Sequence, residues 1–302
     1  MLVNGWDGDG LDYDVVDVFG EAPFTGNQLA VVHGAGGLDD EALLAIAREF
    51  NFSETTFPGA ATGDGYEVRI FTPGWEIPFA GHPTLGTAWV LRSRGLVDGD
   101  EVVQRCGAGE ITVRFGDEVE LSAVPRDLAG PLPEPVAHAL LGDVGLQPDD
   151  LAGPVWLAGT GLTFVHLPVR PEAVARAHPS VRPLAEYAED LPDCADPTDG
   201  INLHAVHGPA ADGALEVHSR VFVPGLDVAE DPATGSAAAG LGIALVAGGQ
   251  LPTGGRYRIR QGVEMGRPSL LHGRVVVEDG AAVRCLVGGR VHPVARGTIR
   301  RP

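Results

Sequence analysis

Phe79-Ala80-Gly81-His82-Pro83-Thr84 and Glu230-Asp231-Pro232-Ala233-Thr234-Gly235-Ser236 are the two stretches around which this chain is organised. Each follows a run of strand-forming residues that ends in a Pro-Gly turn, Arg69–Gly74 in the first half and Arg220–Gly225 in the second. Each also opens a run of residues with helical spacing. The same strand, turn and helix therefore occur twice, half a chain apart, which indicates an internal duplication.

The two helices are predicted at residues 84–95 and 234–248. The second is dominated by Ala, Gly and Leu, which is typical of a helix that is buried on every side. Free backbone N–H groups at a helix start favour an anion. If the helices are the centres of two equivalent domains, their starts meet at one cleft, with His82 and Asp231 at equivalent places in the repeat.

The length of 302 residues and the 44% of hydrophobic residues suit two domains with cores of their own. Short strands with one buried helix per half predict an α+β fold. We expect a loose tail at 1–12, an N-terminal domain at 13–124, alone or together with a segment at 287–300, and a C-terminal domain at 130–286. The Pro-rich stretch 125–135 marks the boundary. Further helices are expected at 39–50, 136–141, 171–178 and 181–187.

The formal net charge of −20 argues against nucleic acid or an anionic membrane as a partner. All 21 basic residues are Arg, and the absence of Lys excludes a pyridoxal phosphate Schiff base, a lysine nucleophile and a Walker A phosphate site. No signal peptide or membrane-spanning run is found, so a cytoplasmic protein is expected. An anionic substrate would then be held by local dipoles and few cations.

Three residues could carry chemistry, and each has an ordinary structural alternative. Glu54 lies among Phe52, Phe57 and hydroxyls, where a carboxyl could be desolvated and its pKa raised, although most Glu side chains are exposed. His82 could serve a site or only satisfy its turn. Asp231 could serve a site or only cap the second helix. The sequence motif alone leaves these alternatives open.

No metal or other cofactor is expected. His204 and His207 are three residues apart on a predicted strand, so they point to opposite faces and would be poor joint ligands. The three cysteines, Cys106, Cys194 and Cys285, are widely spread and form no metal or redox motif.

The motifs resemble the phenazine-biosynthesis PhzF-like family, within the diaminopimelate epimerase-like superfamily. The resemblance runs in family order over nearly the whole chain after residue 13. The matching segments are Asp17–Phe19, Pro23–Asn27, Phe52–Phe57, Glu76–Ala88, Asp231–Ala237, Gln261–Gly262 and Gly266–Ser269.

The resemblance implies two similar domains, each a curved sheet around a central helix, in a cofactor-free homodimer. It implies that Glu54 is a proton shuttle and that His82 and Asp231 hold and polarise a small carboxylate substrate. Asn27, Gly81 and the turn Thr234-Gly235-Ser236 would bind that substrate. The racemase branch of the superfamily carries a cysteine at each helix-entry turn. Neither turn of this chain contains one, which argues against two-thiol racemisation.

The leading hypothesis is an isomerase that relocates a proton on a small cyclic or unsaturated carboxylate, as a relative does with dihydro-3-hydroxyanthranilate. One alternative is an epimerase of a small amino or hydroxy acid that uses the same residues. The other is a protein that binds a metabolite without turning it over and has a regulatory role.

Overall fold

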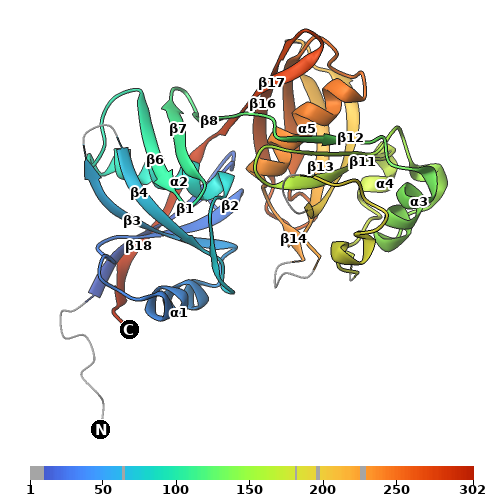
Figure 1. Cartoon of the computed structure of the whole chain (residues 1–302). Coiled ribbons are helices and arrows are strands. Elements are labelled where there is room, and N and C mark those ends of the chain that lie inside the picture. The colour runs from blue at the N-terminus through green and yellow to red at the C-terminus, as the bar shows by residue number, and fades with distance from the viewer. Residues whose placement is uncertain (1–9, 63–64, 181, 195–197, 225–228) are drawn as a thin grey trace.

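The computed structural model describes residues 10–62, 65–180, 182–194, 198–224 and 229–302. Within these residues the chain forms two lobes that lie side by side (Figure 1). In each lobe a strongly curved sheet surrounds one long helix, α2 (Gly81–Ser93) in the first lobe and α5 (Gly235–Ala247) in the second. The predicted α+β class is confirmed.

The first lobe contains a sheet and a second, peripheral helix, α1 (Asp40–Phe50), which Asp39 caps through a bond from Ala42 N–H. Its strands are β1 (Gly10–Val18), β2 (Asn27–Val32), β3 (Glu54–Thr62), β4 (Gly65–Phe71), β5 (Glu76–Ile77), β6 (Glu101–Cys106), β7 (Gly109–Phe115), β8 (Val119–Ala123) and β18 (Val291–Arg300).

The second lobe follows the same plan. Its strands are β9 (Asp127–Ala129), β10 (Trp156–Gly159), β11 (Thr163–Pro168), β12 (Thr198–Pro209), β13 (Leu215–Phe222), β14 (Glu230–Asp231), β15 (Gly255–Gln261), β16 (Ser269–Glu278) and β17 (Ala281–Gly289). Its smaller helices are α3 (Glu134–Asp143), α4 (Pro171–Val174) and the 3-10 helices η1 (Pro148–Asp150) and η2 (Leu184–Tyr187).

The strand pairings show that the duplication extends to the whole topology. The first lobe pairs in the order β18, β1, β2, β3, β4, β6, β7, β8, and the second in the order β9, β10, β11, β12, β13, β15, β16, β17. The parallel pairs fall at the same places, β2 with β3 and β4 with β6, and β11 with β12 and β13 with β15. The two lobes are joined where β8 pairs with β17.

The central helices are buried as their composition predicts. Residues 235–245 of α5 are all buried, and α2 is buried over most of its length. Small side chains allow this, because Gly and Ala let sheet residues approach the helix backbone closely. A Cβ on Gly240, for example, would lie 2.7 Å from the carbonyl oxygen of Ala158.

The strand register corrects one prediction about the repeat. Phe71 pairs with Glu76 in the first lobe and Phe222 pairs with Glu230 in the second, so Asp231 is the counterpart of Ile77. His82 is the second residue of its helix and corresponds to Ser236. His82 and Asp231 are therefore not equivalent, because the second copy places its polar residue on a strand, before the turn.

Three smaller predictions also need correction. Gly10–Asp12 belong to β1 and pair with β18, because the last strand of the chain returns to the first, so they are not a loose tail. The helix expected at 171–178 ends at Val174, and the one expected at 181–187 is a 3-10 helix that starts at Leu184, directly after Pro183. Residues 1–9, Val181 and Gly225 lie outside the described residues.

Candidate active site

The starts of the two central helices touch each other. A Cβ on Gly81 would lie 3.1 Å from Cα of Gly235 and 3.3 Å from the backbone nitrogen of Ser236. A side chain at Gly81 would force the facing backbone to move by a few tenths of an ångström, so glycine suits this approach. The N-cap residues of the two helices, Ala80 and Thr234, make no side-chain cap hydrogen bond. The prediction that the two helix starts converge is confirmed, and their positive dipole ends add at one place.

Asn27, the first residue of β2, connects the two lobes at this place. Its amide nitrogen lies 3.2 Å from Nδ1 of His82, 2.9 Å from Oδ1 of Asp231 and 3.0 Å from the carbonyl oxygen of Ala233. The side chain is buried. One amide therefore contacts the first turn of α2 and the segment directly before α5.

The carboxylate of Asp231 is surrounded by donors. Besides Asn27, the hydroxyl of Thr234 donates to Oδ2 at 2.5 Å and that of Ser53 donates to Oδ1 at 3.4 Å. Burial raises the pKa of Asp231 to about 6, against these three hydrogen bonds, which lower it. Asp231 does not cap α5, because the N-cap position belongs to Thr234.

Glu54 begins β3 and faces the same place. Its side chain is 15% exposed, but its Oε2 is fully buried. Burial, and secondarily the charge of Asp231, raise the pKa of Glu54 well above its usual range. The alternative of an exposed, ordinary Glu is therefore wrong, and the desolvated setting is the one observed.

His82 lies on the first turn of α2 with a side chain that is 4% exposed. Its Nε2 is 3.4 Å from Oε2 of Glu54. Burial lowers the pKa of His82 to about 3, so the ring is neutral at physiological pH. Burial therefore disfavours the charged form of both side chains, the carboxylate of Glu54 and the imidazolium of His82.

The polar atoms at this place divide into two groups. Both oxygens of Asp231 accept hydrogen bonds. Oε2 of Glu54 and Nε2 of His82 are fully buried and make no hydrogen bond within the part of the chain that the structure describes. Buried polar atoms are normally paired, so the exceptions call for an explanation. Proton exchange with a bound molecule is a chemistry that such a pair can perform.

The remaining predicted binding residues also lie here. Gly81, Gly235 and Ser236 form the first turns of the two helices, and Thr234 precedes α5. Two further residues of this network had no predicted role, Ser53 and Gln261. The amide of Gln261 donates to the carbonyl of Asp231 at 2.8 Å and accepts from the N–H of Thr234 at 3.2 Å. Both residues lie in segments that resemble the PhzF-like family, and this resemblance is the sequence signal that could have identified them.

No metal-binding group was found in the described residues, where no three His, Cys, Asp or Glu side chains come together suitably. His204 is buried, and burial lowers its pKa to about 4. Its ring lies 6.4 Å from that of His166, centroid to centroid, inside the second lobe.

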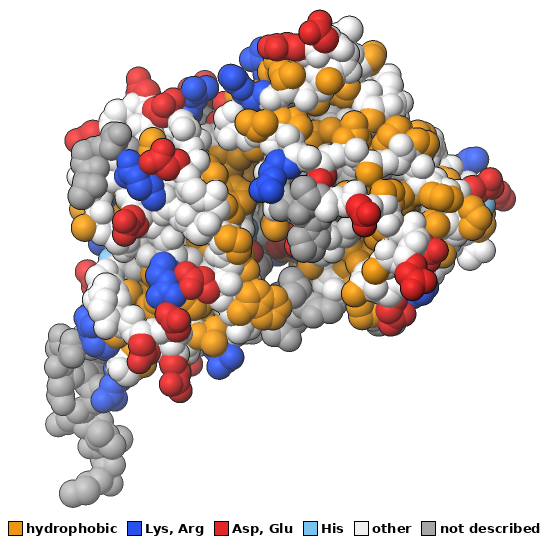
Figure 2. Space-filling model, in the orientation of Figure 1, with side chains coloured by type: hydrophobic (Ala, Val, Ile, Leu, Met, Phe, Trp, Pro, Cys, Tyr) orange, Lys and Arg blue, Asp and Glu red, His pale blue; other side chains and the backbone are white. Residues whose placement is uncertain are grey.

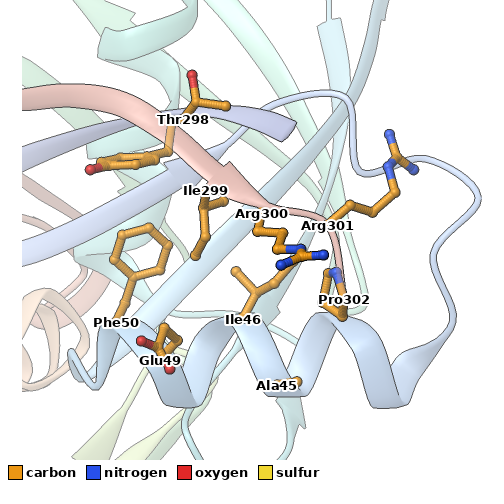
Figure 3. A pocket seen from close by; sticks show the side chains of 10 residues that line it. Ala45, Ile46, Glu49, Phe50, Thr298, Ile299, Arg300, Arg301 and Pro302 are labelled. Carbon is orange, nitrogen blue, oxygen red and sulfur yellow. The ribbon is translucent and has the colours of Figure 1, made fainter. Parts of the chain in front are cut away.

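A separate pocket of about 560 Å³ lies between α1 and the end of β18 (Figure 3). Its lining includes Ile46, Phe50, Ile299 and Arg300 and contains none of Glu54, His82 and Asp231. The face of the molecule shown in Figure 2 carries scattered acidic side chains, in keeping with the net charge of −20. No helix in the described residues is long and apolar enough to cross a membrane.

Comparison with known proteins identifies the fold and the family. Residues 16–297 match the family model PhzC-PhzF, phenazine biosynthesis-like protein. A trans-2,3-dihydro-3-hydroxyanthranilate isomerase of Pseudomonas chlororaphis is 34% identical over 293 residues, which cover 95% of this chain and 98% of the relative. The solved structure of a predicted epimerase from Pseudomonas aeruginosa superposes with a TM-score of 0.80 at 30% identity, over 96% of this chain and 99% of that one.

A more distant structure shows how far the fold extends. A hydroxyproline epimerase from Agrobacterium vitis superposes with a TM-score of 0.64 at 15% identity, over 97% of this chain and 93% of that one, which indicates a shared fold alone. The fold is thus the one that PhzF proteins share with the epimerase-like enzymes. The chain belongs to the PhzC-PhzF family and is an isomerase of the PhzF type.

Proposed function

We propose that the protein relocates a proton between two carbons of a small unsaturated or cyclic carboxylate, without a cofactor, at the junction of the two lobes. Glu54 carries the proton. The observation that supports this most is the pair of buried atoms without hydrogen-bond partners, Oε2 of Glu54 and Nε2 of His82, 3.4 Å apart. A substrate of the kind named for the Pseudomonas chlororaphis relative, trans-2,3-dihydro-3-hydroxyanthranilate, is the first candidate.

The reaction needs one group that is an acid in one half-step and a base in the other. One C–H bond breaks and one forms, so no proton or electron is gained or lost overall. A carboxyl with a raised pKa suits this task, because it holds a proton more readily than an ordinary carboxyl and can still release it as a base. Neutral His82 can then exchange a hydrogen bond with Glu54 or with the substrate without taking up a charge.

The substrate carboxylate has a natural binding place at the two helix starts. Backbone N–H groups of Gly81, Gly235 and Ser236 are there, and two helix dipoles favour an anion. Asp231 would accept a hydrogen bond from an amino or hydroxyl group of the substrate. Asn27 holds Asp231 in place for this contact.

The repeat argues for one proton shuttle rather than two. Thr55 pairs with Phe71 and Ile201 pairs with Phe222, so the counterpart of Glu54 is Gly200. The counterpart of His82 is Ser236. Inversion at one carbon by two bases needs acid and base groups on both faces of the substrate, whereas Glu54 serves one face. This asymmetry favours proton relocation over epimerisation.

The test is proton NMR of trans-2,3-dihydro-3-hydroxyanthranilate with the enzyme in D₂O, beside Glu54→Gln. We expect conversion with deuterium at the new C–H position, lost in the variant because an amide cannot carry the proton. Optical inversion without migration of the double bond would point instead to an epimerase. Binding without exchange would point to a metabolite-binding protein, and either result would contradict the proposal.

We also propose that the protein is a homodimer, as the family resemblance implies, and that it is cytoplasmic, as the sequence leads us to expect. Light scattering coupled to gel filtration tests the assembly, and a monomer mass would contradict it.

A further inference from the structure

The turn that joins β15 to β16 has no part in the proposed chemistry. It nevertheless contains most of the segment Gly266–Ser269, which resembles the PhzF-like family. The turn is compact. Its ends are tied by the bond from Arg267 N–H to the carbonyl of Gly262 at 3.0 Å, and its centre by the bond from Gly266 N–H to the carbonyl of Val263 at 3.1 Å. Gly262 adopts a φ of +70°, which favours glycine.

The side chain of Arg267 reaches from this turn to the first lobe. Its Nη2 lies 2.5 Å from Oδ1 of Asp17, and its Nε donates to the carbonyl of Gly26 at 2.9 Å. The carboxylate of Asp17 is buried, and its Oδ2 accepts from the N–H of Phe24 at 2.6 Å. Gly26 in turn donates to the carbonyl of Pro268 at 3.1 Å. Because Gly26 directly precedes Asn27, these bonds fix the start of β2.

The two ends of the same turn hold the segment that carries Asp231. The hydroxyl of Ser269 donates to the carbonyl of Pro232 at 2.8 Å, and the amide of Gln261 donates to the carbonyl of Asp231 at 2.8 Å. Both side chains are buried. The same turn of the second lobe therefore makes hydrogen bonds to the residue before Asn27 and, at its two ends, to the backbone of Asp231 and Pro232. The amide of Asn27 and the carboxylate of Asp231 lie 2.9 Å apart.

We propose that Arg267 is a positioning residue that sets the amide of Asn27 against the carboxylate of Asp231 by holding Asp17 and the carbonyl of Gly26. The inference rests on the proposed function only in that Asp231 serves the reaction. A guanidinium fits this role because its planar fork can bond a carboxylate and a carbonyl at once, which an ammonium cannot do in the same geometry.

The position of Asn27 has a measurable electrostatic effect. Its hydrogen bond is among those that lower the pKa of Asp231, which burial raises to about 6. The other ionisable groups around Asp231 are Glu54 of β3, His82 of α2 and the adjacent Glu230, which is paired with Arg220 at 2.8 Å. If Asn27 moves away, the charged form of Asp231 loses a donor, and its pKa rises.

The experiment is a ¹³C NMR titration of carboxyl-labelled Asp in the full chain, with the Asp231 signal assigned by Asp231→Asn. Arg267→Met removes the guanidinium and keeps most of the stem, while Arg267→Lys keeps the charge and loses the fork. Arg94→Met is the matched control, because Arg94 pairs with Asp14 at 2.6 Å and its side chain is 20% exposed, against 21% for Arg267.

We expect the Asp231 titration to move to higher pH in both Arg267 variants and to stay unchanged in Arg94→Met. We further expect kcat/KM to fall by roughly 10- to 100-fold in Arg267→Met, as misplacement of a site group does. In an Asn27→Ala background, Arg267→Met should move the titration no further, because Arg267 acts through Asn27.

An unchanged titration in Arg267→Met would overturn the proposal. A shift in Arg267→Met with none in Arg267→Lys would also overturn it, because charge rather than position would then be the cause. If Arg267→Met fails to fold, the Asp231 titration is compared in Arg267→Lys, in Asn27→Ala and in the double variant of these two, and that comparison decides the proposal. The titration needs no substrate, so an inactive wild type in the D₂O experiment would contradict the proposed function and leave this test intact.

Discussion

Glu54 and His82 face each other in a buried setting that disfavours the charged form of both side chains. Their side-chain atoms Oε2 and Nε2 are 3.4 Å apart, burial raises the pKa of the carboxyl and burial lowers that of the imidazole to about 3. An ordinary ion pair would shift both pKa values in the opposite directions. The pair therefore does not act as a stabilising salt bridge, and both shifts are in keeping with the proton transfer proposed for it.

Glu54→Gln should raise the stability of the protein at alkaline pH and leave it unchanged in acid. A carboxyl whose pKa is raised by folding stabilises the fold below its unfolded pKa, about 4.3 for Glu, and loses that contribution as pH rises through the folded pKa. Thermal unfolding of wild type and variant from pH 4 to pH 9 measures this. His82 titrates with the opposite sign, but it is neutral in both the folded and the unfolded state above its unfolded pKa of about 6.5, so the difference at alkaline pH reports Glu54.

The matched control for that series is Glu76→Gln, which changes an exposed carboxyl paired with Arg69 at 2.5 Å. Exposed ion pairs contribute at most about 1 kcal/mol, so little gain at alkaline pH is expected there. If the difference in stability between Glu54→Gln and wild type were the same at every pH, Glu54 would not be desolvated.

Asp231→Asn should shift the pH profile of activity as well as lower it. The charge of Asp231 contributes to the raised pKa of Glu54, so its removal should lower the pKa of Glu54. The limb of the kcat/KM profile that reports ionisation of Glu54 is then expected at lower pH than in wild type. Asp231 itself titrates at about 6 in the folded protein, and the limb at that pH should vanish. A profile with both limbs in their wild-type places would refute the coupling.

Gly81→Ala should reduce activity strongly, because its Cβ would lie 3.1 Å from the backbone of Gly235 and push the helix starts apart. Overpacking of this kind costs about 1–3 kcal/mol, partly offset by the helix propensity of Ala. Gly142→Ala in α3 is the control, since a Cβ there meets nothing within 4 Å. That variant should be fully active and up to about 1 kcal/mol more stable. Equal activities of the two variants would count against close contact of the helix starts.

Extended dialysis against EDTA should leave turnover unchanged, since the described residues offer no cluster of metal ligands. Assays before and after dialysis, with and without added Zn²⁺ or Mg²⁺, provide the measurement. Activity that is lost and then restored by one metal would contradict a cofactor-free reaction.

Much of the fold could be predicted from local patterns. The helix expected at 39–50 is present as α1, and α5 is buried as its Ala and Gly content predicts. The repeat was visible in the two Arg-to-Gly strands, although its register was not. His82 and Asp231 looked equivalent because each stands before a proline, but strand pairing assigns Asp231 to the place of Ile77.

The candidate site was only partly predictable, because burial depends on parts of the chain that are distant in sequence. Nothing around Glu54 in the sequence distinguished an exposed carboxyl from a desolvated one. The distinction depends on Asp231 and on α2, which the sheet brings to it. Gln261 and Arg267 act through hydrogen bonds to segments far from them in sequence, so their type and neighbours gave no physical indication of a role.

The sequence by itself determined the duplication, the two buried helices, the family resemblance and the absence of lysine chemistry, since these depend on residue type and spacing. Only the tertiary structure decided which polar groups meet. The bond between Asn27 and Asp231 joins residues 204 positions apart. Such a contact depends on how the two lobes pack against each other. The raised pKa of Asp231 follows from the burial that this packing produces.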